Sequence, residues 1–398
     1  MTRIVKFSEC VEYMIKGPFG SDMKKSLYVP KGDNTYKVYI QGNAIQQDEA
    51  LGDYYVSEEY FHDKLERFEV HPGDYIITCD GTLGKFIKLS DGIERGVISS
   101  SLLLLKLNEE IINDKYFELL WEHTMLATLA SQARNACLVH LPSAKAIGDL
   151  EVKLPEMSEQ LAIAEKAFSV KRNIAYREKQ QELLDELIKA RFVEMFGDPI
   201  INPRGWRKSK FGDVVYYQEG PGVRNWQFRD SGIKLINIRN IVDDTLDLSN
   251  TNNYLEVDEV NKKYAHFLLN EGDYVMASSG VTWGKIAEVN SEHLPLCLNT
   301  SMIRLRPIDD SVICKSYIYH FIKSDGFRKQ IERLITGSAQ PNFGPSHLAK
   351  VDILVPDIVI QKEFSDFVKQ VDKSKSVVRK SLDEAQLLFD SLMQEYFG

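Results

Sequence analysis

The stretch "FVEMFGDP", residues 192–199, lies at the midpoint of the chain, and the chain closes on a similar stretch, "MQEYFG", residues 393–398. A sequence that nearly repeats its own ending after about two hundred residues suggests an internal duplication, and a repeat of that size decides the whole architecture.

Several separate matches appear at this spacing, and they occur in the same order in both halves. "HPGDYIITCDGTLGKF" (71–86) aligns with "NEGDYVMASSGVTWGKI" (270–286), with one inserted residue. The other aligned pairs are Tyr55 with Tyr254, Ser101 with Ser301, Tyr116 with Tyr317, "KLP" ending at Pro155 with "LVP" ending at Pro356, and Phe196-Gly197 with Phe397-Gly398. The chain is therefore a tandem duplication. Residues that both copies retain belong to the shared scaffold, and residues that differ are available for recognition.

Each copy has two parts of different character. Residues 1–155 and 198–356 mix short apolar runs typical of strands with turn signals and a helix at "KYFELLWEHTMLATLA". Residues 156–197 and 357–398 contain no Pro and no Gly before the terminal Phe-Gly, which predicts one long helix in each. The expected fold is mixed α/β (α+β), with two duplicated domains and two spacer helices.

Apolar residues recur along both predicted helices in steps of four and three. In the central helix they fall in the series Ile163, Ala167, Val170, Ile174, Arg177, Gln181, Leu184, Ile188, Arg191 and Met195. In the distal helix the series is Phe364, Val368, Val371, Lys375, Val378, Leu382, Ala385, Phe389, Leu392 and Tyr396. A mean spacing of about 3.5 residues is typical of a coiled coil. The alternative is two amphipathic helices on separate cores. The length of both series and the polar residues in the middle of each favour pairing of the two helices with each other.

Because a globular part precedes each helix, antiparallel pairing would place the two globular parts at opposite ends of a rod with pseudo-two-fold symmetry. A helix of forty residues is about 60 Å long. The two globular parts would then lie between one and two turns of B-DNA apart, at about 34–36 Å per turn.

Composition excludes several classes of protein. No apolar run is long enough to span a bilayer, and the N-terminal stretch "MTRIVKFSEC" lacks the apolar core of a signal peptide, so we expect a cytoplasmic protein. The five cysteines are scattered and form no CxxC, and the histidines form no HExxH, so we expect no metal site. A net charge of −9 argues against a uniformly basic nucleic-acid binder, although charge can be divided between elements.

Two segments resemble catalytic motifs but do not match the residue patterns that those motifs require. "GVTWGK" (280–285) has one residue too few between its glycines for a phosphate-binding loop and is followed by Ile286, so a Gly-rich turn between strands is favoured. The set of Asp149, Glu151 and Lys153 in "DLEVK" (149–153) is not retained in "KVDIL" (350–354), and the alternation of polar and apolar residues favours a half-buried strand. The Asn-Pro-Pro-aromatic motif of amino-methyltransferases is absent from the sequence.

Two basic windows open the globular parts. Residues 16–37 hold five lysines against two aspartates, and residues 224–239 hold four basic residues against one aspartate, interleaved with Trp226 and Phe228. Lysine and arginine neutralise phosphates, while Asn, Gln and Arg read base edges. With the loop "TGSAQPNFG" (336–344), these windows give the candidate DNA contacts Lys24, Lys25, Lys37, Gln41, Asn43, Arg224, Arg239, Asn240, Gln340 and Asn342. A solvated surface without a ligand is the alternative for either window alone.

The order of these features resembles the specificity subunit of type I restriction-modification systems. The resemblance covers essentially the whole chain and rests on the duplication, on "LPEMSEQLAI" (154–163) and "VPDIVIQKEF" (355–364) at the helix starts, on the "GDY…G…GK" segments and on "TGSAQPNF". The first copy departs from the pattern, with "ARNACLVHL" (133–141) in place of that last loop.

The resemblance implies that each globular part is a target recognition domain for half of a bipartite DNA sequence, with the paired helices as spacer. It implies that two modification subunits, which carry S-adenosylmethionine and methylate adenine, dock on the helices, and that a motor and nuclease subunit can complete the complex. The chain itself would have no cofactor and no catalytic residue. Two other hypotheses remain: a self-contained methyltransferase or nuclease with an unrecognised site, and a coiled-coil scaffold that joins two protein-binding domains without DNA.

Overall fold

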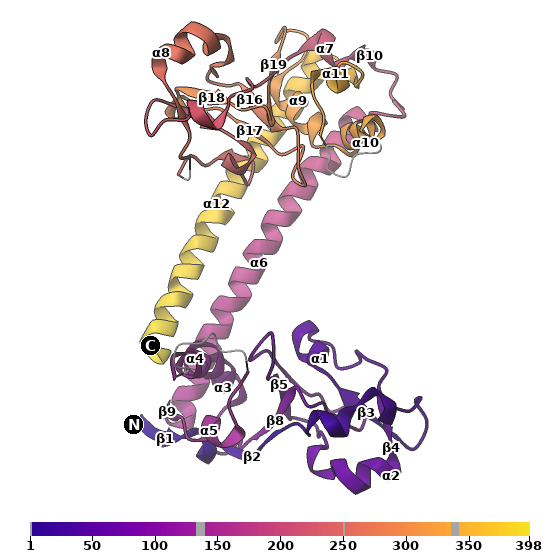
Figure 1. Cartoon of the computed structure of the whole chain (residues 1–398), viewed down its shortest axis with the longest axis vertical. Helices are drawn as coiled ribbons and strands as arrows, with labels where there is room; N and C mark the ends of the chain where they lie inside the picture. The colour runs from indigo at the N-terminus through magenta and orange to yellow at the C-terminus, as the bar shows by residue number, and fades with distance from the viewer. Residues whose placement is uncertain (1, 133–139, 250, 336–341) are drawn as a thin grey trace. The chain divides into compact units, whose positions relative to one another are not determined.

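The chain folds into two units that are built alike. The computed structural model describes residues 2–132, 140–249, 251–335 and 342–398. The first unit comprises residues 1–176 and 381–398, and the second comprises residues 177–380. Figure 1 labels many of the elements of both units.

The first unit contains three sheets. The four-stranded antiparallel sheet has the order β2 (Val11–Lys16), β8 (Leu102–Leu107), β5 (Tyr75–Thr78) and β6 (Phe86–Lys88). The three-stranded sheet has the order β4 (Tyr55–Ser57), β3 (Thr35–Tyr39) and β7 (Gly96–Ile98), with β3 and β7 parallel. The third is a ribbon of β1 (Arg3–Lys6) and β9 (Glu151–Leu154). The helices besides the long ones are α1 (Gln41–Gln46), α2 (Glu58–Tyr60), α3 (Asp114–Leu120), α4 (Leu126–Gln132) and α5 (Ala144–Gly148).

The second unit repeats all three of these sheets. Its four-stranded sheet has the order β11 (Val215–Glu219), β19 (Met302–Pro307), β16 (Tyr274–Ala277) and β17 (Ile286–Glu288). Its three-stranded sheet has the order β15 (Tyr254–Leu255), β12 (Ile233–Ile236) and β18 (Leu296–Leu298), again with the last two parallel, and β10 (Arg207–Lys210) pairs with β20 (Asp352–Val355). The hairpin of β13 (Ile241–Val242) and β14 (Thr245–Leu246) has no counterpart among the strands described in the first unit. The helices are α7 (Phe211–Val214), α8 (Val257–Glu259), α9 (Lys315–Ile322), α10 (Asp325–Leu334) and α11 (Pro345–Leu348). The predicted duplication and mixed α/β class are confirmed.

Two segments that resembled catalytic motifs are structural. β16 and β17 form an antiparallel hairpin around "GVTWGK", so the predicted turn between strands is confirmed. Residues 151–154 form β9, in which alternate side chains are buried, so the predicted half-buried strand is also confirmed.

Each globular core is closed by a helix that packs one apolar face on the four-stranded sheet. Tyr116, Phe117 and Leu120 of α3 are buried in one apolar cluster with Tyr75 of β5. Tyr317, Ile318 and Phe321 of α9 occupy the corresponding cluster of the second unit. Burial of such aromatic and aliphatic side chains is the main favourable contribution to the stability of each unit.

The long helices α6 (Met157–Phe196) and α12 (Ile358–Phe397) are uninterrupted over forty residues each. In the first unit, Ile163 near the start of α6 lies in one apolar cluster with Phe389 near the end of α12. In the second unit, Ile188 near the end of α6 lies in one cluster with Phe364 near the start of α12. The predicted antiparallel pairing is therefore confirmed within each unit. All twenty residues of the two series predicted to pair the long helices are buried or half-buried.

The duplicated endings fill the same place in the two cores. The ring of Phe397, at the end of α12, lies 5.3 Å from that of Tyr116 in the first unit, and the ring of Phe196, at the end of α6, lies 4.8 Å from that of Tyr317 in the second. Each terminal carbonyl is also held: Thr124 donates to the Phe397 oxygen at 2.7 Å, and Trp206 Nε1 donates to the Phe196 oxygen at 3.0 Å. The phenylalanine recurs because the last ring of a long helix packs into the apolar core of each unit.

Among the described residues, no helix combines the length and the apolar character required to cross a membrane.

Candidate nucleic-acid interface

In the first unit, several loops meet at the turn between β7 and β8. The Ser99 N–H donates to the Tyr39 oxygen at the end of β3 (2.9 Å), and the Cys79 N–H donates to the Ser101 oxygen (2.8 Å). The Leu141 N–H in turn donates to the Cys79 oxygen (2.8 Å). These bonds bring the ends of β3 and β5 and the segment before α5 together at one edge of the unit.

The second unit makes the same bonds with different residues. The Asn299 N–H donates to the Ile236 oxygen (3.1 Å), the Ser278 N–H to the Ser301 oxygen (2.9 Å), and the Phe343 N–H to the Ser278 oxygen (3.0 Å). Unsatisfied backbone groups are costly when buried, so these bonds fix the course of the loops. We call this set of hydrogen bonds the frame. In both units the frame holds the corresponding loops at the same points.

The Gly-Pro turn near the start of each basic window lies directly against this frame. A side chain on Gly17 would come within 2.1 Å of the Ser99 oxygen, and one on Gly220 within 2.2 Å of the Asn299 oxygen. Only glycine permits this approach of two backbones. Residues 19–28 and 222–229 therefore leave the frame at the same point in both units. We call these segments, the β5–β6 or β16–β17 turn, the residues after β3 or β12, and residues 140–143 or 342–344 the loop edge of each unit.

The loop edges differ in the side chains that they carry. Both units pair this position through the backbone, Asp80 with His140 and Ser279 with Asn342, and in the first unit His140 Nδ1 also lies 2.6 Å from Asp80 Oδ1. The β16–β17 turn also contacts the segment after β12, because the Cβ position of Gly280 lies 3.6 Å from Ile238 Cδ1. Arg239, the next residue, is exposed there.

The structure leaves six of the predicted DNA contacts accessible. Lys24, Lys25, Arg224, Arg239 and Asn342 are exposed and Gln41 is half-buried, all on loop edges. Gln340 lies outside the described residues. DNA contact by the accessible residues stays a prediction.

Three predicted DNA contacts are corrected, because their side chains are buried and engaged. Lys37 is 2% exposed and its Nζ donates to the Glu49 oxygen at 2.8 Å. Asn43 caps α1: its Oδ1 accepts from the Ile40 N–H (2.8 Å) and its Nδ2 donates to the Asp48 oxygen (2.8 Å). Asn240 makes the equivalent bonds to the Asn237 N–H (2.9 Å) and the Asp247 oxygen (2.9 Å). We assign all three to the scaffold.

Sequence reasoning missed two kinds of residue on the loop edges. The first is the exposed aromatic Phe19, which lies on the loop edge of the first unit as the exposed Trp226 does on that of the second, at 79% and 73% exposure. The second is the lysine of the shared Gly-Lys dipeptide, Lys85 or Lys285, exposed in both units. The signal for these lysines was present in the alignment of the two copies.

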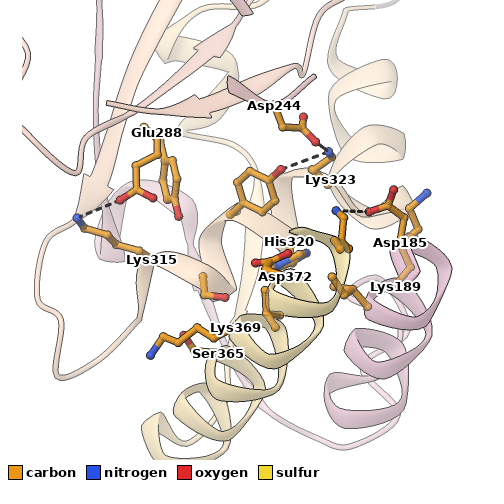
Figure 2. A pocket seen from close by; sticks show the side chains of 16 residues that line it. Asp185, Lys189, Asp244, Glu288, Lys315, His320, Lys323, Ser365, Lys369 and Asp372 are labelled. Atoms are coloured by element: carbon orange, nitrogen blue, oxygen red, sulfur yellow. Dashed lines mark hydrogen bonds and ion pairs between the residues drawn. The ribbon is translucent and has the colours of Figure 1, made fainter. Parts of the chain in front are cut away.

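The second unit also holds a cavity of about 560 Å³ between α9, β17 and both long helices (Figure 2). Ion pairs surround it: Lys375 with Asp185 (2.7 Å), Lys315 with Glu288 (3.8 Å), and Lys323 with Asp244. Burial, together with Lys323 and Lys375, lowers the pKa of His320 on its wall to about 4. Each of these three lysines on the cavity wall is therefore paired with a carboxylate.

The described residues contain no group of three or more His, Cys, Asp or Glu side chains placed to hold a metal ion. Residues 203–386 match the family model of the type I restriction modification DNA specificity domain. Over these residues the chain is similar to the type I specificity family. The match spans most of the second unit, including its loop edge.

Relatives in the type I specificity family extend the similarity to most of the chain. The chain is 24% identical over 378 residues to the type I restriction enzyme MjaVIII specificity subunit of Methanocaldococcus jannaschii, and the match covers 87% of each protein. It is 20% identical over 359 residues to the EcoBI specificity subunit of Escherichia coli, which covers 83% of this chain and 73% of that subunit.

Solved structures of the type I specificity family share the fold. The S subunit from M. genitalium superposes with a TM-score of 0.55 at 14% identity, covering 100% of this chain and 96% of that one. A chain from a structure of the type I R-M system superposes with a TM-score of 0.64 at 15% identity, covering 100% and 97%.

Proposed function

We propose that the chain is a DNA-specificity subunit whose two loop edges read the two parts of a bipartite target. Residues 1–155 and 198–356 would be the two target recognition domains, and the paired helices would space them. The observation that supports this most directly is the matching hydrogen-bond frame: two copies hold the same loops at the same points but carry different side chains on them. That is the arrangement required to read two different sequences with one scaffold.

The chemistry of the loop edges suits DNA. Lys24 and Lys25 in the first unit and Arg224 and Arg239 in the second are exposed cations, although the chain as a whole carries a net charge of −9. Cations contact phosphates, and Arg and Asn side chains form paired hydrogen bonds with base edges in the major groove. Asn342 and Gln41 are the amides best placed for such readout.

We infer that catalysis is performed by partners. Two modification subunits that carry S-adenosylmethionine would dock on the long helices and methylate adenine, and a restriction subunit could join them. Exposed apolar residues on these helices support docking: Leu161, Tyr176, Leu183 and Leu187 on α6, and Val377, Leu387 and Leu388 on α12. Exposed apolar side chains gathered on one element are typical of a protein interface.

Purification of the chain alone and together with its modification subunits tests the proposal. The assembled complex should transfer methyl groups from labelled S-adenosylmethionine to double-stranded DNA, and the lone chain should transfer none. Turnover by the lone chain would contradict the non-catalytic assignment. An assembled complex that neither binds nor methylates DNA would contradict DNA recognition itself.

A further inference from the structure

Lys85 and Lys285 occupy the same position in the two loop edges. Each follows the glycine that ends the turn of a hairpin, β5–β6 in the first unit and β16–β17 in the second. Both side chains are exposed. The two turns differ in length by one residue, yet both end in Gly-Lys.

The fold explains the glycine but not the lysine side chain. Gly84 and Gly284 have φ of 73° and 83°, a conformation that disfavours other residues. The lysine backbone closes each hairpin, since the Thr78 N–H donates to the Lys85 oxygen and the Ala277 N–H to the Lys285 oxygen, both at 2.8 Å. Any residue could supply these carbonyl oxygens. Packing therefore gives no reason for a lysine in both copies.

Neither ammonium group has a partner among the residues that the structure describes: no hydrogen bond or ion pair involves Nζ of Lys85 or Lys285. A second exposed lysine is also shared by the two copies and provides a contrast. Lys64 lies 3.4 Å from an Asp63 carboxylate oxygen and Lys263 lies 3.6 Å from one of Glu259. That pair is locally neutralised, whereas Lys85 and Lys285 each leave a full positive charge on a loop edge.

We propose that Lys85 and Lys285 are a matched pair of phosphate contacts, one on each loop edge, that hold the DNA backbone independently of sequence. The inference rests on the proposed function and deepens it. Two recognition domains that read different bases still meet the same sugar-phosphate backbone, so a contact that carries no sequence information is the one that both copies can share. Base readout then belongs to the side chains that differ, such as His140 and Asn342.

The salt dependence of binding measures phosphate contacts. Each neutralised phosphate contributes about 0.9 to the slope of log K against log salt. Loss of both lysines should lower the slope by about 2 and weaken binding at 0.1 M salt by roughly eightfold per lysine. The loss should be equal for target and unrelated duplexes, because a phosphate contact does not discriminate between bases.

The experiment uses the chain assembled with its modification subunits and two fluorescein-labelled duplexes, one with the methylated motif and one without. Anisotropy titrations over a series of KCl concentrations compare the unaltered chain with K85A/K285A, with K85R/K285R and with K64A/K263A. The proposal predicts a smaller slope for K85A/K285A, rescue by K85R/K285R and an unchanged slope for K64A/K263A. An unchanged slope in K85A/K285A, or a loss confined to the motif duplex, would overturn it while leaving the proposed function intact. Failure of the unaltered complex to bind either duplex would overturn both.

Discussion

Gln160 of α6 and Gln361 of α12 make the same three hydrogen bonds in their respective units. Oε1 of Gln160 accepts from the Asn113 N–H (2.8 Å), and its Nε2 donates to the oxygens of Ile111 (3.0 Å) and Pro155 (2.9 Å). Gln361 accepts from the Cys314 N–H (3.0 Å) and donates to the oxygens of Val312 (3.1 Å) and Pro356 (2.8 Å). Both side chains are essentially inaccessible, at 1% and 0% exposure. Each glutamine fixes the first turn of a long helix to the globular part that precedes it.

Gln160→Ala should loosen this junction in the first unit. Three buried backbone groups would lose their partner, and we expect a loss of about 3 kcal/mol in the free energy of local opening. Hydrogen exchange should show faster exchange of the Asn113 amide, while the Cys314 amide stays protected. Gln361→Ala should give the reverse pattern. Equal protection of the Asn113 amide in the variant would show that the glutamine does not hold the junction.

Phe397→Ala should destabilise the first unit, because the ring completes a core far from it in sequence. Truncation of a buried Phe costs about 3 kcal/mol or more. Phe196→Ala should destabilise the second unit by a similar amount. Leu388→Ala, which removes an exposed side chain from the same helix, is the control. Thermal unfolding followed by calorimetry should show a lower midpoint for both Phe variants and not for the control. Phe397→Ala without effect would mean that the end of α12 is dispensable for the core.

The pKa of His320 makes the second unit sensitive to acid. Burial, with Lys323 and Lys375, lowers this pKa from 6.5 to about 4, against a smaller opposing effect of Asp244. The unfolded chain therefore binds a proton between these two pH values that the folded chain does not, so stability falls as pH falls from 6.5 towards 4. We expect about 3 kcal/mol of loss from this residue.

The equivalent residue in the first unit is Leu119, which gives a natural replacement for His320. Chemical unfolding of His320→Leu at a series of pH values should show a smaller loss of stability in this window than the unaltered chain. Identical pH profiles of stability for the two proteins would show that His320 does not cause the loss of stability.

Trp226 should report DNA binding by its fluorescence. It is 73% exposed, whereas Trp121 and Trp283 are buried and Trp206 is half-buried. In the major groove of duplex DNA, an apolar side chain can contact the methyl group of thymine. DNA bound to the assembled complex should protect Trp226 from acrylamide quenching, and Trp226→Phe should abolish the change while binding persists. Unchanged quenching on binding would place Trp226 outside the interface.

The sequence predicted the architecture well because its signals are long. The duplication and the two long seams each extend over many residues, so local exceptions such as Arg177 and Gln181 did not hide them. The same alignment could have corrected the site. Asn43 and Asn240 align with each other, and a polar residue retained in both copies inside a turn signals a cap on the scaffold.

Other parts could not be read from one sequence, because they depend on contacts between distant segments. Lys88 pairs with Asp114 at 3.1 Å in the first unit, and the same positions in the second carry Glu288 and Lys315 at 3.8 Å, with the charges exchanged. Position by position these substitutions look like divergence. Only the fold shows that the two changes compensate each other across β6–α3 and β17–α9.

The central claim is that each unit reads its own part of one DNA target. Methylated adenines should be mapped across the genome of a host that produces the chain with its modification subunits, and then with Arg239→Ala and Asn342→Ala variants of the chain. The account predicts a motif of two specified parts separated by an unspecified gap, and in these variants loss of specificity in one part alone. A continuous motif, or variants that alter both parts equally, would contradict it.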